Sequence, residues 1–342
     1  GAGISVAAGI PDFRSKQKIP GIPQLGKKKL KDMFQLSMLT QESQKPLFCQ
    51  FIASLARKTD ESEPTLFHEL LRVLDRRGVL VRTYTQNIDG LEPKAGLSTY
   101  HRSSSRGDLR TDTCVPLHGD LQHVYCQLCN AVEPLSRHQE QLAGGSLPAC
   151  SSCYHKQESR REAGLRVQTV PTMVPDVVLY GQEHPDADGI ARFQTQDLSG
   201  ARKVDLLLVV GTGMHILGTQ RMIRDFAHTV RRDQPPDDPS PRVVYLNLDF
   251  RQRKKWEAIF DLWVQADCQA VARAVLDELS SVEGSPEQEV MVPSPRKGVD
   301  VRDESSQVGP KKKTQKNKAS LVCKVHRKQE KQADSSTVSD FI

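Results

Sequence analysis

The chain has 342 residues, enough for one large domain or two modest ones, and its apolar fraction of 37% predicts that part of it is disordered. No stretch approaches the roughly 18 to 20 consecutive apolar residues of a membrane span, and no charged-then-apolar leader is visible at the first residues, so we expect no membrane association. The net charge of +6 is unevenly distributed, because residues 310–331 hold nine Lys or Arg against the single acid Glu330; this suggests nuclear import or an acidic partner.

The chain opens with GAGISVAAGIPDFRS, a glycine-rich turn followed by an aromatic and a cationic residue. Gly1 and Gly3 would let the backbone approach a pyrophosphate, with amide N–H groups facing the anion. Phe13 and Arg14 suit a flat ring carried on phosphates. The pattern departs from G-x-G-x-x-G at Val6, and a simple glycine turn before a proline loop is the alternative. Such a loop normally follows a buried strand, so we expect a strand to precede it.

Three apolar runs predict buried parallel strands, at 79–87, 204–213 and 242–249. Helical patterns lie between them, notably at 65–78 and 217–232. Strands that alternate with helices predict an α/β fold with a Rossmann-like doubly wound parallel sheet. Ligands of such sheets bind at the carboxyl ends of the strands.

Polar residues stand at the ends of these runs. In TQNIDGL (85–91), the amides of Gln86 and Asn87 can hold ribose hydroxyls, and the Asp89 carboxylate can accept from an amide-bearing ring. The alternative is that these residues only form a turn. This would explain Asn87 or Asp89 taken singly, but it explains less well why Gln86, Asn87 and Asp89 occur together. The two later strands repeat the arrangement, with a phosphate binder and two ribose binders at their ends: Thr212, Asn247 and Asp249.

Eight cysteines occur, and four of them form two Cys-x-x-Cys pairs. The pairs are separated by 20 residues and consist of Cys126, Cys129, Cys150 and Cys153. Four thiolates close a tetrahedral zinc shell, which predicts a structural Zn²⁺ site. Four reduced cysteines without metal are one alternative, and a nucleic-acid zinc ribbon is another. His123 and His155 could replace a thiolate, but we expect both to be exposed.

Three segments interrupt the α/β pattern. Residues 114–175, with short apolar pieces and the cysteine pairs, predict a small module inserted into the larger one. Residues 98–113 lack apolar periodicity and predict an exposed loop. From 283 to 342 few large apolar residues occur, so we expect a disordered basic tail.

Taken in order, these motifs resemble the sirtuin family of NAD-dependent protein-lysine deacylases. The matching stretches are GAGISVAAGIPDFRS, TQNIDGL with AG (95–96), LHG (117–119), the cysteine pairs, GTG (211–213) and LNLD (246–249). The resemblance implies a catalytic domain over 1–278 that contains the zinc module. It also implies His118 as the catalytic base, whose ordinary pKa near 6.5 lets it take a proton at neutral pH. NAD would be the co-substrate, and the products formed from it would be nicotinamide and O-acetyl-ADP-ribose.

The same resemblance implies a set of NAD-binding residues. They are Gly1, Ala2, Gly3, Ile4, Ser5, Asp12, Phe13, Arg14, Gln86, Asn87, Ile88, Asp89, Gly211, Thr212, Gly213, Asn247, Leu248, Asp249 and Cys268. Cys268 is more simply interpreted as a buried residue.

The stretch VVLYGQEHP (177–185) aligns with a Phe-Gly-Glu segment of the family that forms the acyl-lysine tunnel. Tyr180 keeps an aromatic wall there, whereas Gln182 lacks the charge of the family's Glu. The polar loop at 98–113, the GTGMHILGT phrasing and the basic tail resemble the fungal nuclear branch that deacetylates core histones. This implies a nuclear protein that acts on acetyl-lysine of histones or other proteins in chromatin, in silencing or genome maintenance, with an import receptor for the tail.

Two other functions are open to the sequence. A sirtuin-like protein ADP-ribosyltransferase would use the same NAD site, although an intact LHG and the aromatic wall favour deacylation. A catalytically silent zinc-ribbon module that binds chromatin is the alternative outside enzymes. The combination of Asn87, Asp89 and His118 disfavours it, because a pure binder has no need for all three.

Overall fold

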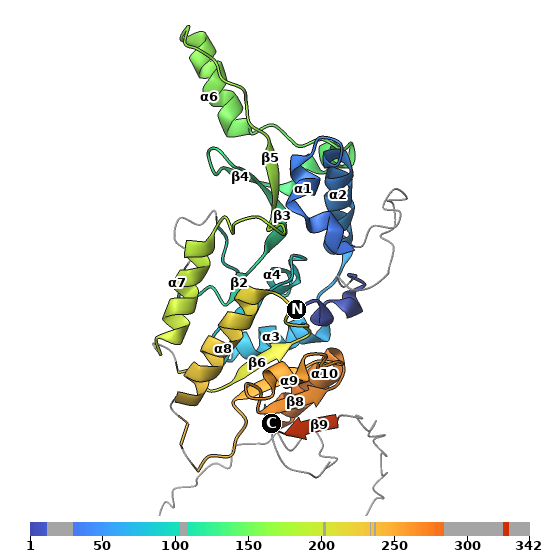
Figure 1. Ribbon diagram of the computed structural model, residues 1–342, viewed down its shortest axis with the longest axis vertical. Helices are drawn as coiled ribbons and strands as arrows, with labels where there is room; N and C mark the ends of the chain where they lie inside the picture. The colour runs from blue at the N-terminus through green and yellow to red at the C-terminus, as the bar shows by residue number, and fades with distance from the viewer. Residues whose placement is uncertain are drawn as a thin grey trace, which may run out of the picture.

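The computed structural model describes residues 1–11, 30–102, 108–200, 203–232, 234–235, 237–283 and 324–327. These residues form a large lobe with parallel strands and a small lobe with antiparallel strands, which lie at the bottom and the top of Figure 1. The first residue lies near the junction of the two lobes.

Parallel strands form the centre of the large lobe. One ladder consists of β6 (Leu207–Val210), β7 (Val243–Leu246) and β8 (Leu262–Gln265). A second parallel pair consists of β1 (Thr83–Thr85) and β2 (Cys114–Pro116). Each of the three predicted strand regions contains one of these strands, so those predictions are confirmed. The strands are shorter than predicted: residues 79–82 and 204–206 precede the hydrogen-bonded ladders, and the polar residues at the carboxyl ends lie beyond them.

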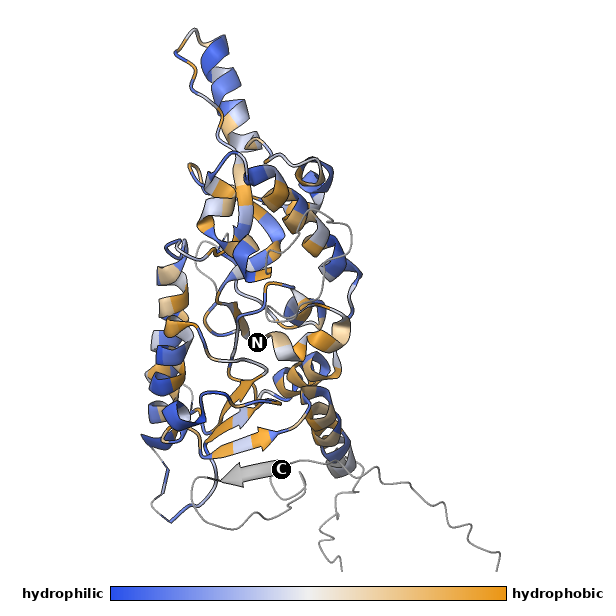
Figure 2. Ribbon diagram, turned by 45° about the vertical axis from the view of Figure 1, so that its right-hand side comes forward, coloured by the Kyte–Doolittle hydropathy of each residue, from blue (hydrophilic) through white to orange (hydrophobic). Residues whose placement is uncertain are grey.

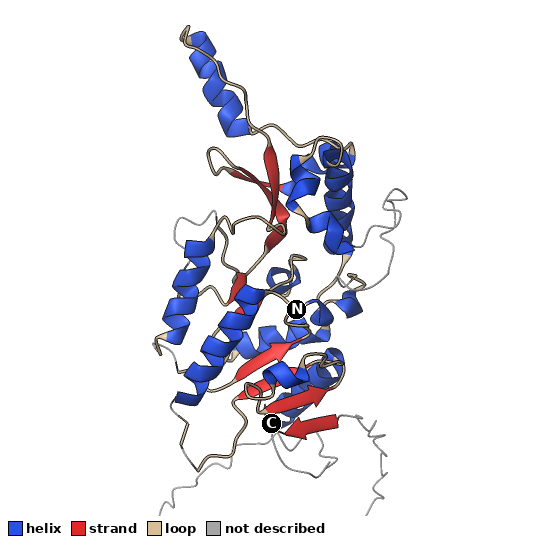
Figure 3. Cartoon of the chain, in the orientation of Figure 1, coloured by secondary structure: helices blue, strands red, loops and turns tan. Residues whose placement is uncertain are grey.

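Helices cover both faces of these strands, as the predicted doubly wound fold requires (Figure 3). Apolar residues of α3 (Leu66–Arg76) and α10 (Cys268–Glu283) share one core. On the opposite face, α8 (Leu217–Arg232) packs on β6 and β7, and α7 (Ala187–Leu198) lies beside it. Short helices α4 (Leu91–Lys94) and α9 (Arg253–Trp256) complete the lobe. The helices predicted at 65–78 and 217–232 are therefore confirmed.

The small lobe is an antiparallel sheet covered by helices. Its strand order is β4 (Val132–Pro134), β3 (Gly119–Cys126) and β5 (Met173–Val177). The helices are α1 (Leu36–Thr40), α2 (Lys45–Glu61), α5 (Gln139–Ala143) and α6 (Ser151–Glu162). Figure 2 shows the large-lobe strands in orange and α6, which projects from the small lobe, mostly in blue.

The small lobe differs in extent from the module predicted at 114–175. β2 lies in that range but pairs with β1 in the large lobe. Conversely, α1 and α2 precede the range, yet their apolar residues share one core with β3 and β5. The physical reason is area: a three-stranded sheet buries an apolar face only when a helix covers it, and α2 supplies that helix.

Two other segments differ from the sequence expectations. The loop at 98–113 was expected to be exposed, but Tyr100 is buried and packs against Phe193, with ring centroids 4.8 Å apart. Of the predicted tail, the structure describes only Glu283 and β9 (Lys324–Arg327), a strand that pairs antiparallel with β8 and that the sequence analysis did not predict. No helix in the described ranges has the length and apolar character needed to cross a membrane.

Candidate functional site

The glycine loop at the start of the chain packs directly against the turn after β6. Gly3 N–H donates to the Gly211 carbonyl at 2.9 Å. A Cβ on Gly3 would lie 2.6 Å from Gly211 Cα, and one on Gly1 would lie 2.7 Å from Thr212 Cβ. Only glycine fits these positions, because real Cβ atoms do not approach so closely. The loop therefore presents bare backbone at the carboxyl end of the sheet, which is what the approach of a phosphate requires.

Side chains after β1 connect the loop to the turn after β6. Gln86 Nε2 donates to Thr212 Oγ1 at 3.1 Å. Asn87 Nδ2 lies 3.1 Å from Ser5 Oγ and 3.3 Å from the Gly1 carbonyl. Three of the segments predicted to bind NAD thus meet at the carboxyl end of the sheet, namely those around Gly1, Gln86 with Asn87, and Thr212.

Beneath this edge lies a buried group of ionisable side chains formed by Asp89, His68 and Glu92, whose ligand-type atoms are within 4.8 Å of one another. Burial, reinforced by Glu92, raises the pKa of Asp89 to about 6, and burial lowers the pKa of His68 to about 4. Among the described residues, His68 Nε2 and Glu92 Oε1 have no hydrogen-bond partner. Sequence reasoning missed His68, although it is the third residue after the helix N-cap Thr65 and closes a capping box with it.

His118 follows β2 and is held by the backbone of the β1 end. Its Nδ1 lies 3.1 Å from the Gln86 carbonyl oxygen. Because a carbonyl can only accept, Nδ1 carries the proton, and in the neutral ring Nε2 then keeps its lone pair. Burial lowers the pKa of His118, which favours this neutral form. The His118 carbonyl in turn accepts from Val178 N–H at 3.0 Å, which fixes the residue to the segment after β5.

A cavity of about 640 Å³ lies between the lobes. Its walls come from the end of α2, the residues after β1 and the start of β3, including Asp60, Asn87, Asp89 and Gly119. The volume lies within the usual range of small-molecule sites. His118 immediately precedes the wall residue Gly119.

Other predicted cofactor residues lie further along the sheet edge or in the core. Asn247 Nδ2 donates to Tyr245 Oη at 2.8 Å and to the Asp249 carbonyl at 2.6 Å, so it shapes the turn after β7. The Asp249 carboxylate pairs with Arg251, and Leu248 is exposed. Cys268 is buried at the start of α10, as its simpler interpretation predicts. Asp12, Phe13 and Arg14 lie outside the described residues.

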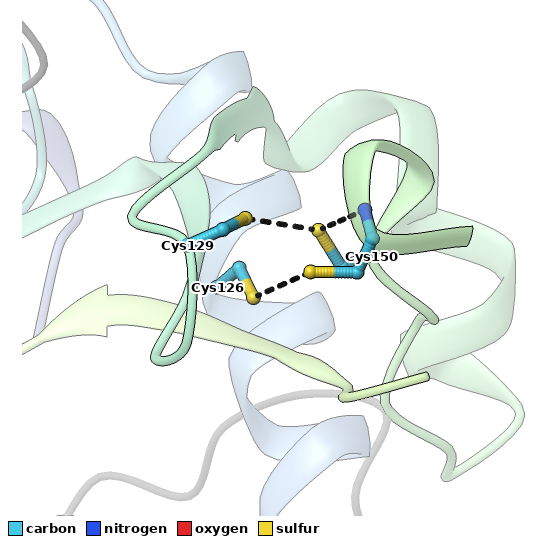
Figure 4. Close-up of side chains that lie close together, drawn as sticks. Cys126, Cys129 and Cys150 are labelled. Atoms are coloured by element: carbon cyan, nitrogen blue, oxygen red, sulfur yellow. Dashed lines mark hydrogen bonds between the residues drawn. The ribbon is translucent and has the colours of Figure 1, made fainter. Parts of the chain in front are cut away.

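The four cysteines converge at the base of α6 (Figure 4). Cys126 ends β3, Cys129 follows in the turn, and Cys150 is the N-cap of α6. The Sγ atoms of Cys126 and Cys153 are 3.9 Å apart, and those of Cys129 and Cys150 are 3.6 Å apart. A zinc tetrahedron with bonds of about 2.3 Å has edges of about 3.8 Å, so the four thiols fit structural Zn²⁺. Neither His123 nor His155 belongs to this group of ligand atoms.

The segment aligned with the family's tunnel crosses the small lobe near α1. Tyr180 pairs through its backbone with the residues flanking Gln35: its N–H donates to the Phe34 carbonyl at 2.8 Å, and its own carbonyl accepts from Leu36 N–H at 3.1 Å. The Tyr180 side chain is half-exposed. Gln182 Oε1 accepts from Leu179 N–H at 3.2 Å, so this residue stabilises the local turn.

The chain is similar in sequence to proteins of known family. Residues 1–218 match the model of the Sir2 family. The "NAD-dependent histone deacetylase HST4" of Saccharomyces cerevisiae is 34% identical over 281 residues, which are 79% of this chain and 72% of that protein. The "NAD-dependent histone deacetylase HST3" of the same yeast is 30% identical over 284 residues, 78% of this chain and 61% of that protein.

Solved structures resemble the fold. One, described as "Sir2-p53 peptide-NAD+", has a TM-score of 0.57 at 21% identity and covers 82% of this chain and 91% of its own. Another, from work on "The Structural basis of Sirtuin Substrate Affinity", has a TM-score of 0.58 at 21% identity, with 81% and 91% covered. At this identity the likeness establishes the fold.

Proposed function

Because the chain belongs to the Sir2 family, we propose that it is an NAD-dependent protein-lysine deacetylase that acts on core histones. The chain spans 72% and 61% of the two yeast relatives named as histone deacetylases. Its own residues provide the parts that such a reaction needs: a glycine loop for phosphates, amides and a carboxylate at the strand ends, and a neutral imidazole on the residue that precedes the cavity-wall residue Gly119.

One observation carries the proposal: Gln86 holds both the base and the phosphate-binding turn. Its backbone carbonyl accepts from His118 Nδ1, and its side chain donates to Thr212. The lone pair of His118 Nε2 and the loop are therefore held in a fixed relation, as general-base catalysis requires. NAD, when bound, supplies the ADP-ribose that accepts the acetyl group and releases nicotinamide.

Individual roles follow from position. We assign the phosphates to the backbone of Gly1 and Gly3 and to Thr212, and the ribose beside the leaving ring to Asn87. We assign the carboxamide of the leaving ring to Asp89, because burial raises the pKa of Asp89 to about 6, so that it could donate or accept a proton near that pH. The four cysteines hold zinc away from the reacting atoms and supply no open coordination position.

The proposal is tested by mass spectrometry of an acetylated histone peptide incubated with the full chain, with and without NAD. We expect loss of the acetyl mass and matching O-acetyl-ADP-ribose only with NAD. His118→Ala should reduce the rate by at least about 100-fold, because general-base catalysis contributes roughly 10²- to 10⁴-fold. His228→Ala, on the exposed face of α8, is the matched control and should retain full activity.

Other results would replace the proposal. A gain of ADP-ribose mass on the peptide or protein would identify a transferase. No reaction by folded, zinc-loaded protein that still binds chromatin fragments would identify a binding module.

We also propose a nuclear location, with chromatin and an import receptor as partners. The basic run at 310–331 and the histone deacetylase names of the relatives support this. Replacing Lys311, Lys312 and Lys313 with Ala in a fluorescent fusion of the chain should increase the cytoplasmic share of the fluorescence, as seen by microscopy. An unchanged nuclear signal would contradict a role of the run in import.

A further inference from the structure

A second group of metal-ligand side chains lies at the wall of the cavity, separate from the four cysteines. It consists of His101, Asp120 and His123, whose ligand-type atoms all lie within 4.8 Å of one another. His101 comes from the loop before β2, and the other two from β3. All three line the cavity and are partly exposed to it.

Local folding of β3 places Asp120 and His123 on the same side. Residues three apart in a regular strand point to opposite faces. Here the register of β3 against β5 shifts between Gly119 and Val124, as in a β-bulge. Gln122 N–H also donates to Asp120 Oδ1 at 2.8 Å, which holds the carboxylate toward the bulge.

The three close contacts among these side chains cannot all be hydrogen bonds. His101 Nε2 is 2.7 Å from His123 Nδ1 and 3.1 Å from Asp120 Oδ2, and His123 Nδ1 is 2.9 Å from Asp120 Oδ1. Each ring nitrogen carries at most one proton, so two protons at most serve three close contacts. If both nitrogens donate to the carboxylate, two N–H groups face each other. A cation bound between the two ring nitrogens and the carboxylate would remove this conflict, because all three groups would then direct lone pairs at the cation.

The donor set fits a divalent transition-metal ion. Two imidazole nitrogens and one carboxylate suit zinc and its neighbours and leave at least one position open, here on the cavity side. A second carboxylate, Asp176, lies near His101 and pairs with Arg102 at 3.1 Å. This ion pair directs the Arg102 guanidinium to Asp176.

We propose that His101, Asp120 and His123 bind a zinc ion or a related divalent transition-metal ion, distinct from the four-cysteine zinc, at the wall of the central cavity. The open coordination position faces the same space as Asn87 and Asp89. The ion is therefore exchangeable, whereas the four thiolates enclose theirs.

The test is a titration of the zinc-loaded full chain with Co²⁺, followed by visible absorption. We expect a saturable d–d band at one further equivalent, without the thiolate-to-cobalt charge transfer that occupation of the cysteine site would produce. His101→Ala and Asp120→Asn should each abolish this band. Asp120→Asn keeps the side-chain volume, so it separates ligand loss from misfolding.

His138→Ala is the matched control, because His138 is also a partly buried, ion-paired histidine of the small lobe, 2.9 Å from Glu133. It should leave the Co²⁺ band unchanged. Zinc content of one equivalent and an unchanged far-ultraviolet circular dichroism spectrum verify that each variant is folded. A band that is absent from the parent protein, or equal in all variants, would overturn the proposal. None of these readouts depends on NAD or on an acetylated peptide, so they do not bear on the deacetylase proposal.

Discussion

Asp89, in the cavity wall, and His68 lie close together, and burial shifts the pKa of each in the direction that favours its neutral form. Their effects on stability have opposite signs. Asp89 binds a proton more tightly in the folded protein, so its contribution falls as pH rises from about 4 to about 6. His68 binds a proton more tightly in the unfolded chain, so its contribution rises with pH between about 4 and 6.5. In the parent protein the two contributions oppose each other.

Replacing either Asp89 or His68 should expose the pH dependence that the other residue contributes to stability. We expect Asp89→Asn to make the free energy of unfolding rise more steeply with pH between 4 and 6 than in the parent, by up to roughly 3 kcal/mol over the interval. His68→Gln should change the slope in the opposite direction. Urea unfolding at a series of pH values measures both, and parallel curves for the parent and Asp89→Asn would show that Asp89 titrates normally.

At the scale of one element, β3 begins at a position that accepts only glycine. Gly119 has φ 73°, and a Cβ there would lie 1.9 Å from the Asp176 carbonyl oxygen of β5. The contact fixes the start of β3 against β5, directly after His118 and directly before Asp120. The close approach of Gly119 to β5 thus positions both of its neighbours, the proposed base His118 and the proposed metal ligand Asp120.

Gly119→Ala should therefore destabilise the protein by more than the roughly 1 to 2 kcal/mol that a left-handed conformation costs an L residue. Gly164→Ala is the matched control, because Gly164 has φ 70° but nothing within 4 Å of its Cβ position. The difference between the two variants in urea unfolding measures the clash at β5. Equal losses would mean that β5 moves aside without cost.

At the scale of the whole molecule, the small lobe links the cysteines to the cavity. Cys126, Cys150 and Cys153 belong to the same apolar core as Phe48 and Phe51 of α2. Thr59 and Asp60, near the carboxyl end of α2, line the cavity. Loss of the four-cysteine zinc should therefore loosen α2 and change a wall of the proposed active site.

Hydrogen exchange measured by mass spectrometry tests this coupling. We expect Cys153→Ser, or removal of zinc by a strong chelator, to speed exchange in peptides from α2 and β3 by at least about 10-fold. Peptides from α8 in the large lobe serve as the internal control and should exchange at the parent rate. Protection of α2 that survives zinc loss would show that the lobe folds without its metal.

The sequence alone predicted the α/β class, the strand and helix regions, and the identities of the cysteine and strand-end residues. These features depend on local information: apolar periodicity, polar residues at strand ends, and paired cysteines at short spacing. The motif TQNIDGL puts Asn87 and Asp89 at the end of a predicted strand, so the pattern by itself predicts a ligand-binding position there. The role proposed for His118 in LHG is implied only by the resemblance to the sirtuin family.

Only the tertiary structure decided which distant residues meet. It joined α2 to β3 and β5 in one core, moved β2 into the large lobe, and buried Tyr100 where a polar loop was expected. It also brought His101 and His123 together across 22 positions. The physical reason is that a side chain's partners depend on chain reversals and on a shift of strand register, and local propensities carry no information about either.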